Sequence, residues 1–304
     1  MKIGIIGINT AQHEEQFKII HNTLKKKLHG IFSHSEDAIP LCANYNLKLY
    51  KSANELFDHV DAVYFANSLK SNYEFALSAL KKSCHIFIED IATLTIDEVK
   101  HLYKVAFEAG AKIQLKLTKA FTPEYLEVRD YMKDPKLIEI NKSFTRFQRH
   151  DDYFSEILNN LFFAYQNINS GIKKIATLAL PIDNSHFSLI QIRLDYDNGS
   201  VVNMKLNCIT KEEISLADFH EKDKIINVDF ISHFATKYQF TEGQVVRHEF
   251  GIPNEKAVDT EMLNFINSCQ SLDQQNISES PKELKLFQVT KDIMERLIQS
   301  THPR

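Results

Sequence analysis

Two adjacent carboxylates stand where an α/β protein commonly binds its ligand. The apolar run 85–89 (HIFIE) predicts a buried strand, and Glu89 and Asp90 come at its end. In an open parallel sheet, ligands bind outside the carboxyl ends of the strands. Glu89 and Asp90 are therefore the first candidates for binding or proton transfer.

The start of the chain predicts a phosphate-binding turn. Residues 3–6 (IGII) form a strand-length apolar run that stops at Gly7. A strand, a tight turn and a helix make the first half of a βαβ unit, and the N–H groups at the helix start favour a phosphate. The dinucleotide fingerprint G-x-G-x-x-G would cover residues 7–12, but only its first glycine is present and Asn9 replaces the second. Asn tolerates a positive φ, so the turn is still expected. The predicted binding residues are Gly7, Ile8, Asn9 and Thr10.

The first 118 residues alternate between strand-length apolar runs and helical periodicity. Such alternation predicts parallel βαβ units, and hence a doubly wound sheet. The expected strands are 3–6, 28–33, 61–66, 85–89 and 112–117, with a short extended piece at 49–50, and the expected helices are 14–27, 36–45, 53–59, 72–82 and 95–110.

From residue 119 onward, strands follow one another in hairpin succession. This pattern predicts an α+β domain with a mostly antiparallel open sheet, covered by helices on one face. Asn198-Gly199 predicts a type I′ hairpin turn, and His150-Asp151-Asp152 is expected to be an acid-rich loop. We therefore expect domains at 1–118 and 119–304. The expected strands are 137–148, 172–180, 187–196, 200–208, 225–231 and 245–250, and the expected helices are 124–132, 259–268 and 281–300.

Composition excludes several classes of protein. A net charge of −4 over 304 residues gives no reason to expect nucleic acid or an anionic membrane as partner. No apolar run reaches the roughly 18 residues of a membrane helix, and the N-terminus does not resemble a signal peptide. The four cysteines have no paired spacing, so we expect reduced thiols, no metal site and a cytoplasmic protein.

The order of these elements, together with several phrases, resembles the glucose–fructose oxidoreductase / inositol dehydrogenase / MocA (Gfo/Idh/MocA) family. The phrases are GIIGIN at the start, LYKSANELFDHVDAVYFAN at 49–67, HIFIEDIATLTIDEVKHL at 85–102 and AFTPEYLEVRDYM at 120–132. The resemblance implies an N-terminal Rossmann domain that binds NAD or NADP. It also implies a C-terminal domain whose open sheet covers the active site and often forms the interface of a dimer or tetramer.

The positions that carry catalysis in the resembled family hold other residues here. The family's Glu-Lys-Pro is Glu89-Asp90-Ile91, so an acid replaces the catalytic cation. Its Asp-x-x-x-His pair aligns with Glu156 and Asn160, and an asparagine amide cannot act as an acid or base. Its Thr-Pro and the later histidine are replaced by Asn67, Ser68 and Asn72. By the resemblance, Asn67 and Glu89 are nevertheless expected among the cofactor-binding residues.

A working enzyme would therefore need a different proton donor. Tyr125 is one candidate, and Asp90 is another if its environment keeps it protonated. We expect Glu89 and Asp90 to face a second group of residues across a cleft. That group comprises Lys119, Tyr125, Glu156 and Asn160.

The residues after the second strand bear on the choice of cofactor. NAD-specific Rossmann domains carry an acidic residue there, whereas this chain has Ser33 and His34. These two residues favour the 2′-phosphate of NADP, but NAD binding and no dinucleotide binding both remain open.

Three functions remain open. One is an NAD(P)-dependent oxidoreductase acting on a sugar-like or other small alcohol or carbonyl substrate. The second is an inactive relative that binds a dinucleotide or metabolite and acts as a sensor or regulator. The third is a subunit that supports an active paralogue.

Overall fold

The computed structural model describes residues 1–8, 10–36, 38–68, 73–145, 150–183, 186–251, 259–270 and 282–299, with the backbone alone for residues 10–16, 67 and 68. The chain divides into two compact units. The first comprises residues 1–116 and 254–285, and the second comprises residues 117–253 and 286–304.

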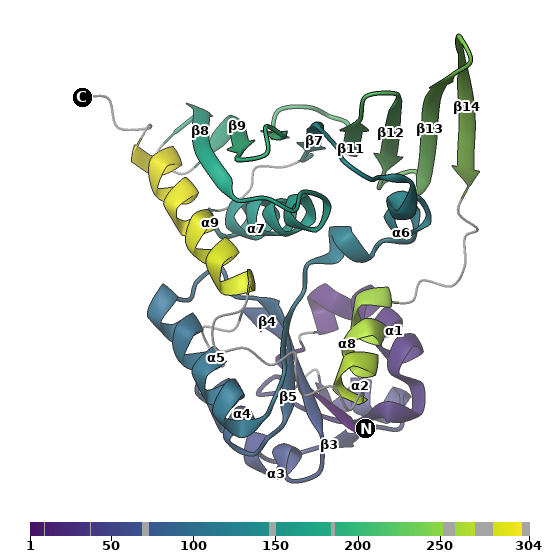
Figure 1. Ribbon diagram of the computed structural model, residues 1–304. Helices are drawn as coiled ribbons and strands as arrows, with labels where there is room; N and C mark the ends of the chain where they lie inside the picture. The colour runs from purple at the N-terminus through teal and green to yellow at the C-terminus, as the bar shows by residue number, and fades with distance from the viewer. Residues whose placement is uncertain are drawn as a thin grey trace. The chain divides into compact units, whose positions relative to one another are not determined.

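A six-stranded sheet forms the centre of the first unit. Its strands are ordered β3-β2-β1-β4-β5-β6, and every neighbouring pair is parallel. This order, with helices between the strands, confirms the predicted doubly wound fold (Figure 1). The strands are β1 (Ile3–Ile6), β2 (Leu28–Phe32), β3 (Lys48–Leu49), β4 (Ala62–Ser68), β5 (His85–Asp90) and β6 (Ile113–Leu115).

Local sequence signals set both ends of helix α5 in the first unit. In α5 (Ile96–Ala109), Thr95 and Glu98 form a capping box, and Gly110 follows the last turn with a left-handed φ of 64°. The other helices described in this unit are α1 (Thr10–Leu24), α2 (Ala38–Asn44), α3 (Ala53–Phe57), α4 (Tyr73–Lys81) and α8 (Thr260–Gln270), and the 3₁₀ turn η1 (Lys25–Lys27) follows α1.

Helix α8 packs on the sheet of the first unit although it comes late in the sequence. Its Phe265 contacts Phe87 of β5 with ring centroids 5.4 Å apart, and Met262 and Ile266 are buried in the same core as Ile5. The sequence analysis expected residues 119–304 to form one continuous second domain. In the structure, apolar residues of α8 complete the first unit's core instead.

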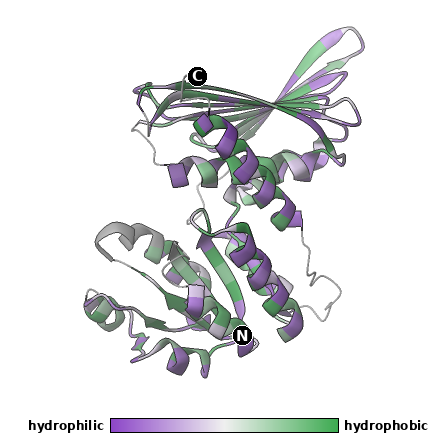
Figure 2. Cartoon of the chain, turned by 90° about the vertical axis from the view of Figure 1, so that its left-hand side faces the viewer, coloured by the Kyte–Doolittle hydropathy of each residue, from purple (hydrophilic) through white to green (hydrophobic). Residues whose placement is uncertain are grey.

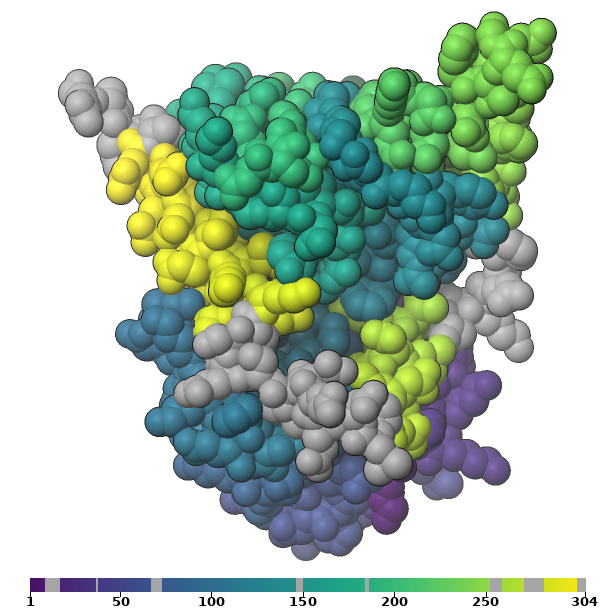
Figure 3. Space-filling view, in the orientation of Figure 1, coloured from purple at the N-terminus to yellow at the C-terminus, as the bar shows by residue number. Residues whose placement is uncertain are grey.

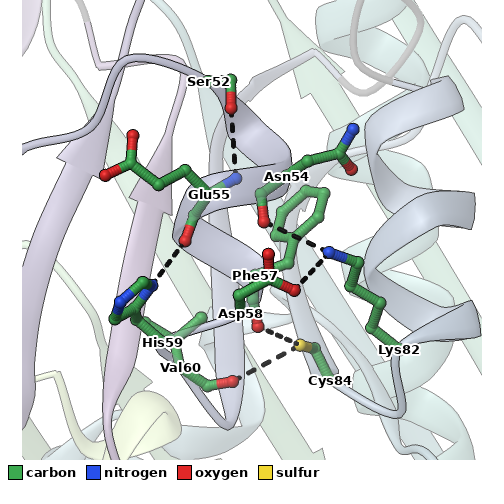
Figure 4. A network of polar contacts seen from close by, with 9 residues as sticks. All are labelled: Ser52, Asn54, Glu55, Phe57, Asp58, His59, Val60, Lys82 and Cys84. Carbon is green, nitrogen blue, oxygen red and sulfur yellow. Dashed lines mark hydrogen bonds and ion pairs between the residues drawn. The ribbon is translucent and has the colours of Figure 1, made fainter.

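A polar network connects α3 and the residues after it to the turn between α4 and β5 (Figure 4). Ser52 caps the helix by accepting the N–H of Glu55, and Lys82 forms an ion pair with Asp58. The Cys84 thiol donates to the carbonyl oxygens of Phe57 and Val60, and burial raises the pKa of this thiol to about 11. Cys84 is thus a structural thiol.

The second unit is built on an eight-stranded sheet in the order β14-β13-β12-β11-β7-β10-β9-β8. All neighbours are antiparallel except β7 and β10, which confirms the mostly antiparallel sheet. Hydrophobic and hydrophilic residues alternate along its strands (Figure 2). The strands are β7 (Leu137–Ser143), β8 (Ile172–Pro181), β9 (Phe187–Tyr196), β10 (Val201–Asn207), β11 (Ile214–His220), β12 (Lys224–Asp229), β13 (Phe234–Thr241) and β14 (Gln244–Gly251).

Helix α7 (His150–Asn167) begins where the sequence analysis expected a loop. The predicted loop at His150-Asp151-Asp152 is wrong, because these residues form the first turn of this helix. Acidic residues are favourable at a helix N-terminus, and buried residues recur through α7 at helical spacing. The remaining helices are α6 (Pro123–Val128), the 3₁₀ turns η3 (Thr118–Phe121) and η4 (Arg129–Tyr131), and α9 (Lys282–Gln299), which belongs to this unit from Leu286 on.

Two strands of this sheet, β11 and β13, were not expected from the sequence.

The hairpin between β9 and β10 is present, but its predicted turn type is wrong. A type I′ turn requires a positive φ at both central residues, and of Asn198 and Gly199 only Gly199 has one, at 82°. The N–H of Gly199 donates to the carbonyl oxygen of Tyr196, so the loop is a tight turn followed by a left-handed glycine. At the other side of the sheet, the β13–β14 hairpin extends beyond the other strands (Figures 1 and 3).

Candidate functional site

The turn between β1 and α1 has the geometry of a phosphate-binding turn. Gly7 has a φ of 84°, a left-handed conformation that glycine adopts without strain, and Ile8 is buried. Helix α1 begins at Thr10, so its free N–H groups follow immediately. This strand, left-handed glycine and helix fit the pyrophosphate of a dinucleotide.

The end of β2 is tied to this turn. The Ser33 hydroxyl donates to the carbonyl oxygen of Ile8 at 3.3 Å and accepts the N–H of Ser35 at 3.1 Å. His34 is exposed, and its ring stacks on Phe75 with centroids 6.3 Å apart. Of the two predicted cofactor residues, Ser33 therefore holds the turn together, and His34 remains available to a ligand.

Several predicted site residues lie outside what the structure describes. Asn9 and Asn72 are outside the described residues, as are the side chains of Thr10 and Asn67. Their predicted roles stay predictions.

Glu89 lies in a polar network within the first unit. The Tyr64 hydroxyl donates to Glu89 Oε2, and the Lys116 ammonium donates to Oε1 at 2.8 Å and to Oε2 at 3.1 Å. Tyr64 is in β4, Glu89 in β5, and Lys116 follows β6. Three neighbouring strands thus hold the carboxylate from two sides.

Lys116 is the centre of a wider group of carboxylates. Burial alone would lower the pKa of Lys116, but the ion pair with Glu89 and the charges of Asp259 and Glu261 raise it above its ordinary value. Gln114 of β6 donates to Glu261 at 3.3 Å, which links α8 to the same strand. The sequence analysis did not select Lys116. Its place at the end of the strand next to Glu89 was the available signal.

Asp90 closes the turn after β5. Its Oδ1 accepts the backbone N–H of Ala92 at 2.8 Å. Successive residues of a strand point to opposite faces, so the side chains of Glu89 and Asp90 leave β5 on different faces.

In the second unit, Lys119 of η3 reaches the two α7 residues that align with the family's catalytic pair. Its ammonium donates to Glu156 Oε1 at 3.1 Å and to Asn160 Oδ1 at 2.5 Å. The Lys119 side chain is 6% exposed and the Glu156 side chain 17%, and Asn160 is fully buried. Glu156 and Asn160 are four residues apart in α7, so they lie on one face of the helix.

The electrostatic surroundings of Glu156 favour its ionised form. Burial would raise the pKa of the Glu156 carboxyl, but the charges of Lys119 and Lys142 and the hydrogen bond from Lys119 lower it. Glu156 is therefore an ionised carboxylate at neutral pH. The backbone N–H of Lys119 also donates to Asn159 Oδ1 at 3.3 Å, which fixes η3 on α7.

Tyr125 is in the same unit but not in this cluster. Its hydroxyl donates to Asn167 Oδ1 at 3.2 Å, and its ring packs against Phe163 and Phe219. Burial raises the pKa of Tyr125, which opposes ionisation of the hydroxyl. The structure thus joins Lys119, Glu156 and Asn160 and places Tyr125 in the aromatic core. The predicted approach of Glu89 and Asp90 to this group stays a prediction.

The residues that the structure describes were also searched for metal-binding groups and for membrane-spanning helices. Among the described residues, no group of three or more His, Cys, Asp or Glu side chains could hold a metal ion. Within the same ranges, no helix is long and apolar enough to cross a membrane.

Known proteins resemble this chain over nearly its whole length. A UDP-N-acetylglucosamine 3-dehydrogenase from Acidithiobacillus ferrooxidans is 21% identical over 88% of both chains. The solved structure of the enzyme of that name, GnnA from the same organism, matches with a TM-score of 0.83 at 18% identity, covering 98% of this chain and 99% of that one.

Two further solved structures share the fold. A dehydrogenase (MviM) from Clostridium difficile has a TM-score of 0.78 at 19% identity and covers 99% of both chains. A super-repressor mutant of Gal80p from Saccharomyces cerevisiae has a TM-score of 0.77 at 13% identity, over 99% of this chain and 96% of that one. Residues 1–117 match the family model described as an oxidoreductase family with an NAD-binding Rossmann fold. The match to this oxidoreductase family model thus covers the first 117 residues, and the solved structures share the fold of nearly the whole chain.

Proposed function

We propose that the protein is an oxidoreductase that uses a nicotinamide dinucleotide to interconvert a sugar-like alcohol and the corresponding ketone. The observation that carries this proposal is the left-handed Gly7 between β1 and the first turn of α1. A family relative named as a UDP-N-acetylglucosamine 3-dehydrogenase supports a sugar substrate.

Gly7, Ile8 and the first turn of α1 would hold the pyrophosphate through backbone N–H groups. When bound, the dinucleotide supplies or accepts the hydride. His34, exposed beside Phe75 at the end of β2, would meet the adenosine ribose, and an imidazole there favours the 2′-phosphate of NADP over the bare hydroxyl of NAD. We therefore propose NADP as the preferred cofactor.

The direct test is a titration of the purified protein with NADPH and NADH, followed by nicotinamide emission. The chain contains no tryptophan, so direct excitation of the nicotinamide gives the cleaner signal. We expect micromolar binding, tighter for NADPH. His34→Asp should reverse the preference, because a carboxylate repels the 2′-phosphate and accepts the ribose hydroxyls of NADH.

Lys285→Asp serves as a control, because it makes a larger change toward negative charge at a position that lies in α9 and not at the end of β2. It should leave the NADPH preference unchanged. If neither nucleotide binds at millimolar concentration, the oxidoreductase proposal fails.

A second candidate is a catalytically inactive family member that binds a dinucleotide or metabolite and reports it to a partner. The observation in its favour is that Asp90 and Asn160 occupy the positions of the resembled family's catalytic lysine and histidine. One of the solved structures with this fold is that of a super-repressor mutant of Gal80p, and super-repression is a regulatory phenotype. Tight NADPH binding without oxidation of any sugar would favour this candidate.

We also propose that the protein is cytoplasmic and forms a homo-oligomer through the sheet of the second unit. Leu178 and Leu180 of β8 are 51% and 47% exposed, and Ile182 beyond its end is 49% exposed. A row of large exposed apolar side chains is typical of an interface. Light scattering with size-exclusion chromatography tests this, and a wild-type monomer at high micromolar concentration would contradict it.

A further inference from the structure

Strand β14 lies at one edge of the second unit's sheet and presents its backbone for pairing. It is the last strand in the sheet order, and among the described residues no strand pairs with it on the side away from β13. Residues 244–249 are all exposed, and Val245 is 68% exposed. An exposed edge strand presents a row of N–H and C=O groups with which another chain can pair.

The opposite edge of the sheet, β8, has features against pairing that β14 lacks. β8 contains Lys173, Lys174 and Pro181, and its register against β9 shifts near both ends. The side chain of Arg296 in α9 also donates to the carbonyl oxygen of Ile175 in β8. Lysines, prolines and bulges keep edge strands from pairing. β14 contains neither lysine nor proline, and its register against β13 has no shift.

The hydrogen bonds of β13 determine which backbone groups of β14 face the open edge. The N–H of Phe240 donates to the carbonyl oxygen of Asp223, the residue before β12, at 2.8 Å. Because the residues of an antiparallel strand direct their backbone groups alternately to its two sides, those of Phe240 point away from β14. Val245 is directly opposite Phe240, so its own N–H and C=O point away from β13. The same holds for every second residue from Val245 to Gly251.

A second copy of β14 fits this edge in one register. Arg247 and Glu249 form an ion pair at 2.6 Å on one face of the strand and remain 55% and 52% exposed. In an antiparallel two-fold pair centred on His248, Arg247 of each copy is directly opposite Glu249 of the other. Both residues have their backbone groups at the open edge, so the ladder hydrogen bonds can form.

Neighbouring registers are unfavourable. A shift of the two-fold centre by one residue places Arg247 opposite Arg247 or Glu249 opposite Glu249, and like charges directly opposite each other are destabilising. A shift by half a residue pairs backbone groups that face the open edge with groups that face β13. The charge pattern and the backbone alternation therefore select the same register.

The other residues of β14 are compatible with this register. Val245 is opposite Gly251 of the other copy, which has no side chain to collide with it. On the second face of the strand, Val246, which is 41% exposed, is opposite Phe250. Apolar groups thus meet on both sides of the charged pairs.

We propose that β14 is a dimer interface, in which two copies of this chain pair their β14 strands antiparallel about His248 and join their sheets into one. Arg247 and Glu249 of the two copies then form a square of alternating charges, with opposite charges along every side. The inference does not depend on dinucleotide binding. It also adds a surface separate from the exposed apolar row of β8, because β8 and β14 are at opposite ends of the sheet order.

Cysteine cross-linking of the full chain tests the register. In the proposed pair, the two copies of residue 248 form a non-hydrogen-bonded pair with Cα atoms about 4.5 Å apart, a distance that a disulfide spans. His248→Cys should therefore give a disulfide-linked dimer under mild oxidation, seen as a doubled mass on a non-reducing gel. Val246→Cys is the matched control, because it lies on the same face of β14 but its two copies would be about 14 Å apart. Neither this variant nor the wild type, with its four native cysteines, should be linked.

Charge reversal tests the pairing of Arg247 with Glu249 without cysteine chemistry. Arg247→Glu and Glu249→Arg each create two like-charge pairs across the two-fold axis, so each should raise the dissociation constant of the dimer about 10-fold or more. The double variant Arg247→Glu/Glu249→Arg restores the alternation and should recover most of the affinity. Lys222→Glu changes the net charge as Arg247→Glu does, at an exposed position between β11 and β12, and should have no effect.

Sedimentation velocity over a concentration series measures these dissociation constants, and circular dichroism verifies that each variant is folded. We expect the wild type to associate at concentrations up to about 100 µM. The inference is overturned by a wild type that stays monomeric, by single variants that associate unchanged, or by a double variant as weak as the singles. Equal cross-linking of Val246→Cys and His248→Cys also overturns it.

A contact through the β8 row can be told apart from the β14 interface. Leu178→Lys places a charge in that row and should leave the His248→Cys cross-link intact, because the two strands are at opposite ends of the sheet order. Loss of the cross-link in this variant would overturn a separate β14 interface.

Discussion

Glu89 and Lys116 form an ion pair of 2.8 Å across the ends of β5 and β6, and the Tyr64 hydroxyl donates to the same carboxylate. Glu89 was predicted to bind cofactor from its place at the end of a strand. That role stays a prediction, and the contacts of Glu89 connect β4, β5 and the residue that follows β6.

Removal of the Lys116 charge should therefore destabilise the first unit. In Lys116→Met, Glu89 loses its ion-pair partner while its side chain stays only 24% exposed, so we expect a loss of about 1–3 kcal/mol in the free energy of unfolding. Urea denaturation followed by circular dichroism measures it. The double variant Lys116→Met/Glu89→Leu should regain part of this loss, because no buried charge is left unpaired; a double variant less stable than Lys116→Met would contradict the argument.

The left-handed conformation of Gly7 should matter for both stability and binding. Gly7→Ala places a Cβ at a φ of 84°, which costs about 1–2 kcal/mol, and distorts the turn that would hold the pyrophosphate. We expect NADPH binding at least 10-fold weaker. Gly110→Ala is the control: its φ is 64° and its added Cβ would meet no atom within 4 Å, so it should cost similar stability without affecting binding.

Stability should fall as the pH drops below about 6.5. Burial, with a smaller effect from Lys112, lowers the pKa of His85, whose Nδ1 accepts the backbone N–H of Lys112 at 2.9 Å. The unfolded chain then takes up the proton first as pH falls through the ordinary histidine pKa, so the folded state loses stability until its own lower pKa is reached. His29 acts in the same direction, because burial and Lys2 lower its pKa.

Denaturation midpoints at pH 5.5 and 7.5 measure this effect. His85→Asn keeps an acceptor for the Lys112 N–H but does not titrate, so its midpoint should change less with pH than that of wild type. Equal changes in the two proteins would show that His85 is not a source of the pH dependence.

Tyr125→Phe should separate a structural tyrosine from a catalytic one. It removes the hydroxyl bond to Asn167 but keeps the ring between Phe163 and Phe219, so we expect a loss of about 1 kcal/mol and little change in turnover. Steady-state kinetics beside a denaturation curve tests both. A 100-fold loss of turnover with unchanged stability would return the catalytic role to Tyr125.

The capping box of α5 gives a prediction from local structure alone. Thr95→Ala removes the acceptor for the N–H of Glu98 and should cost about 1 kcal/mol. Thr95→Ser keeps the oxygen and should cost much less. The midpoints of thermal unfolding of the wild type, Thr95→Ala and Thr95→Ser measure this difference. Equal midpoints would mean that the cap does not stabilise the native state.

The sequence by itself determined the elements that local signals specify. Thr95, Glu98 and Gly110 set the ends of α5, and the apolar run after Met1 set β1, because capping and periodicity act over a few residues. The same kind of signal was present in α7 and was missed, since Tyr153, Ile157 and Leu161 recur at helical spacing. The resemblance to known family phrases supplied the catalytic positions.

Only the tertiary structure decided which side chains meet. Lys116 reaches Glu89 across 27 residues, Lys119 reaches Asn160 across 41, and α8 packs on a sheet that begins more than 250 residues before it. Such pairs depend on how separate elements pack and on which face each side chain takes, which no short stretch of sequence records.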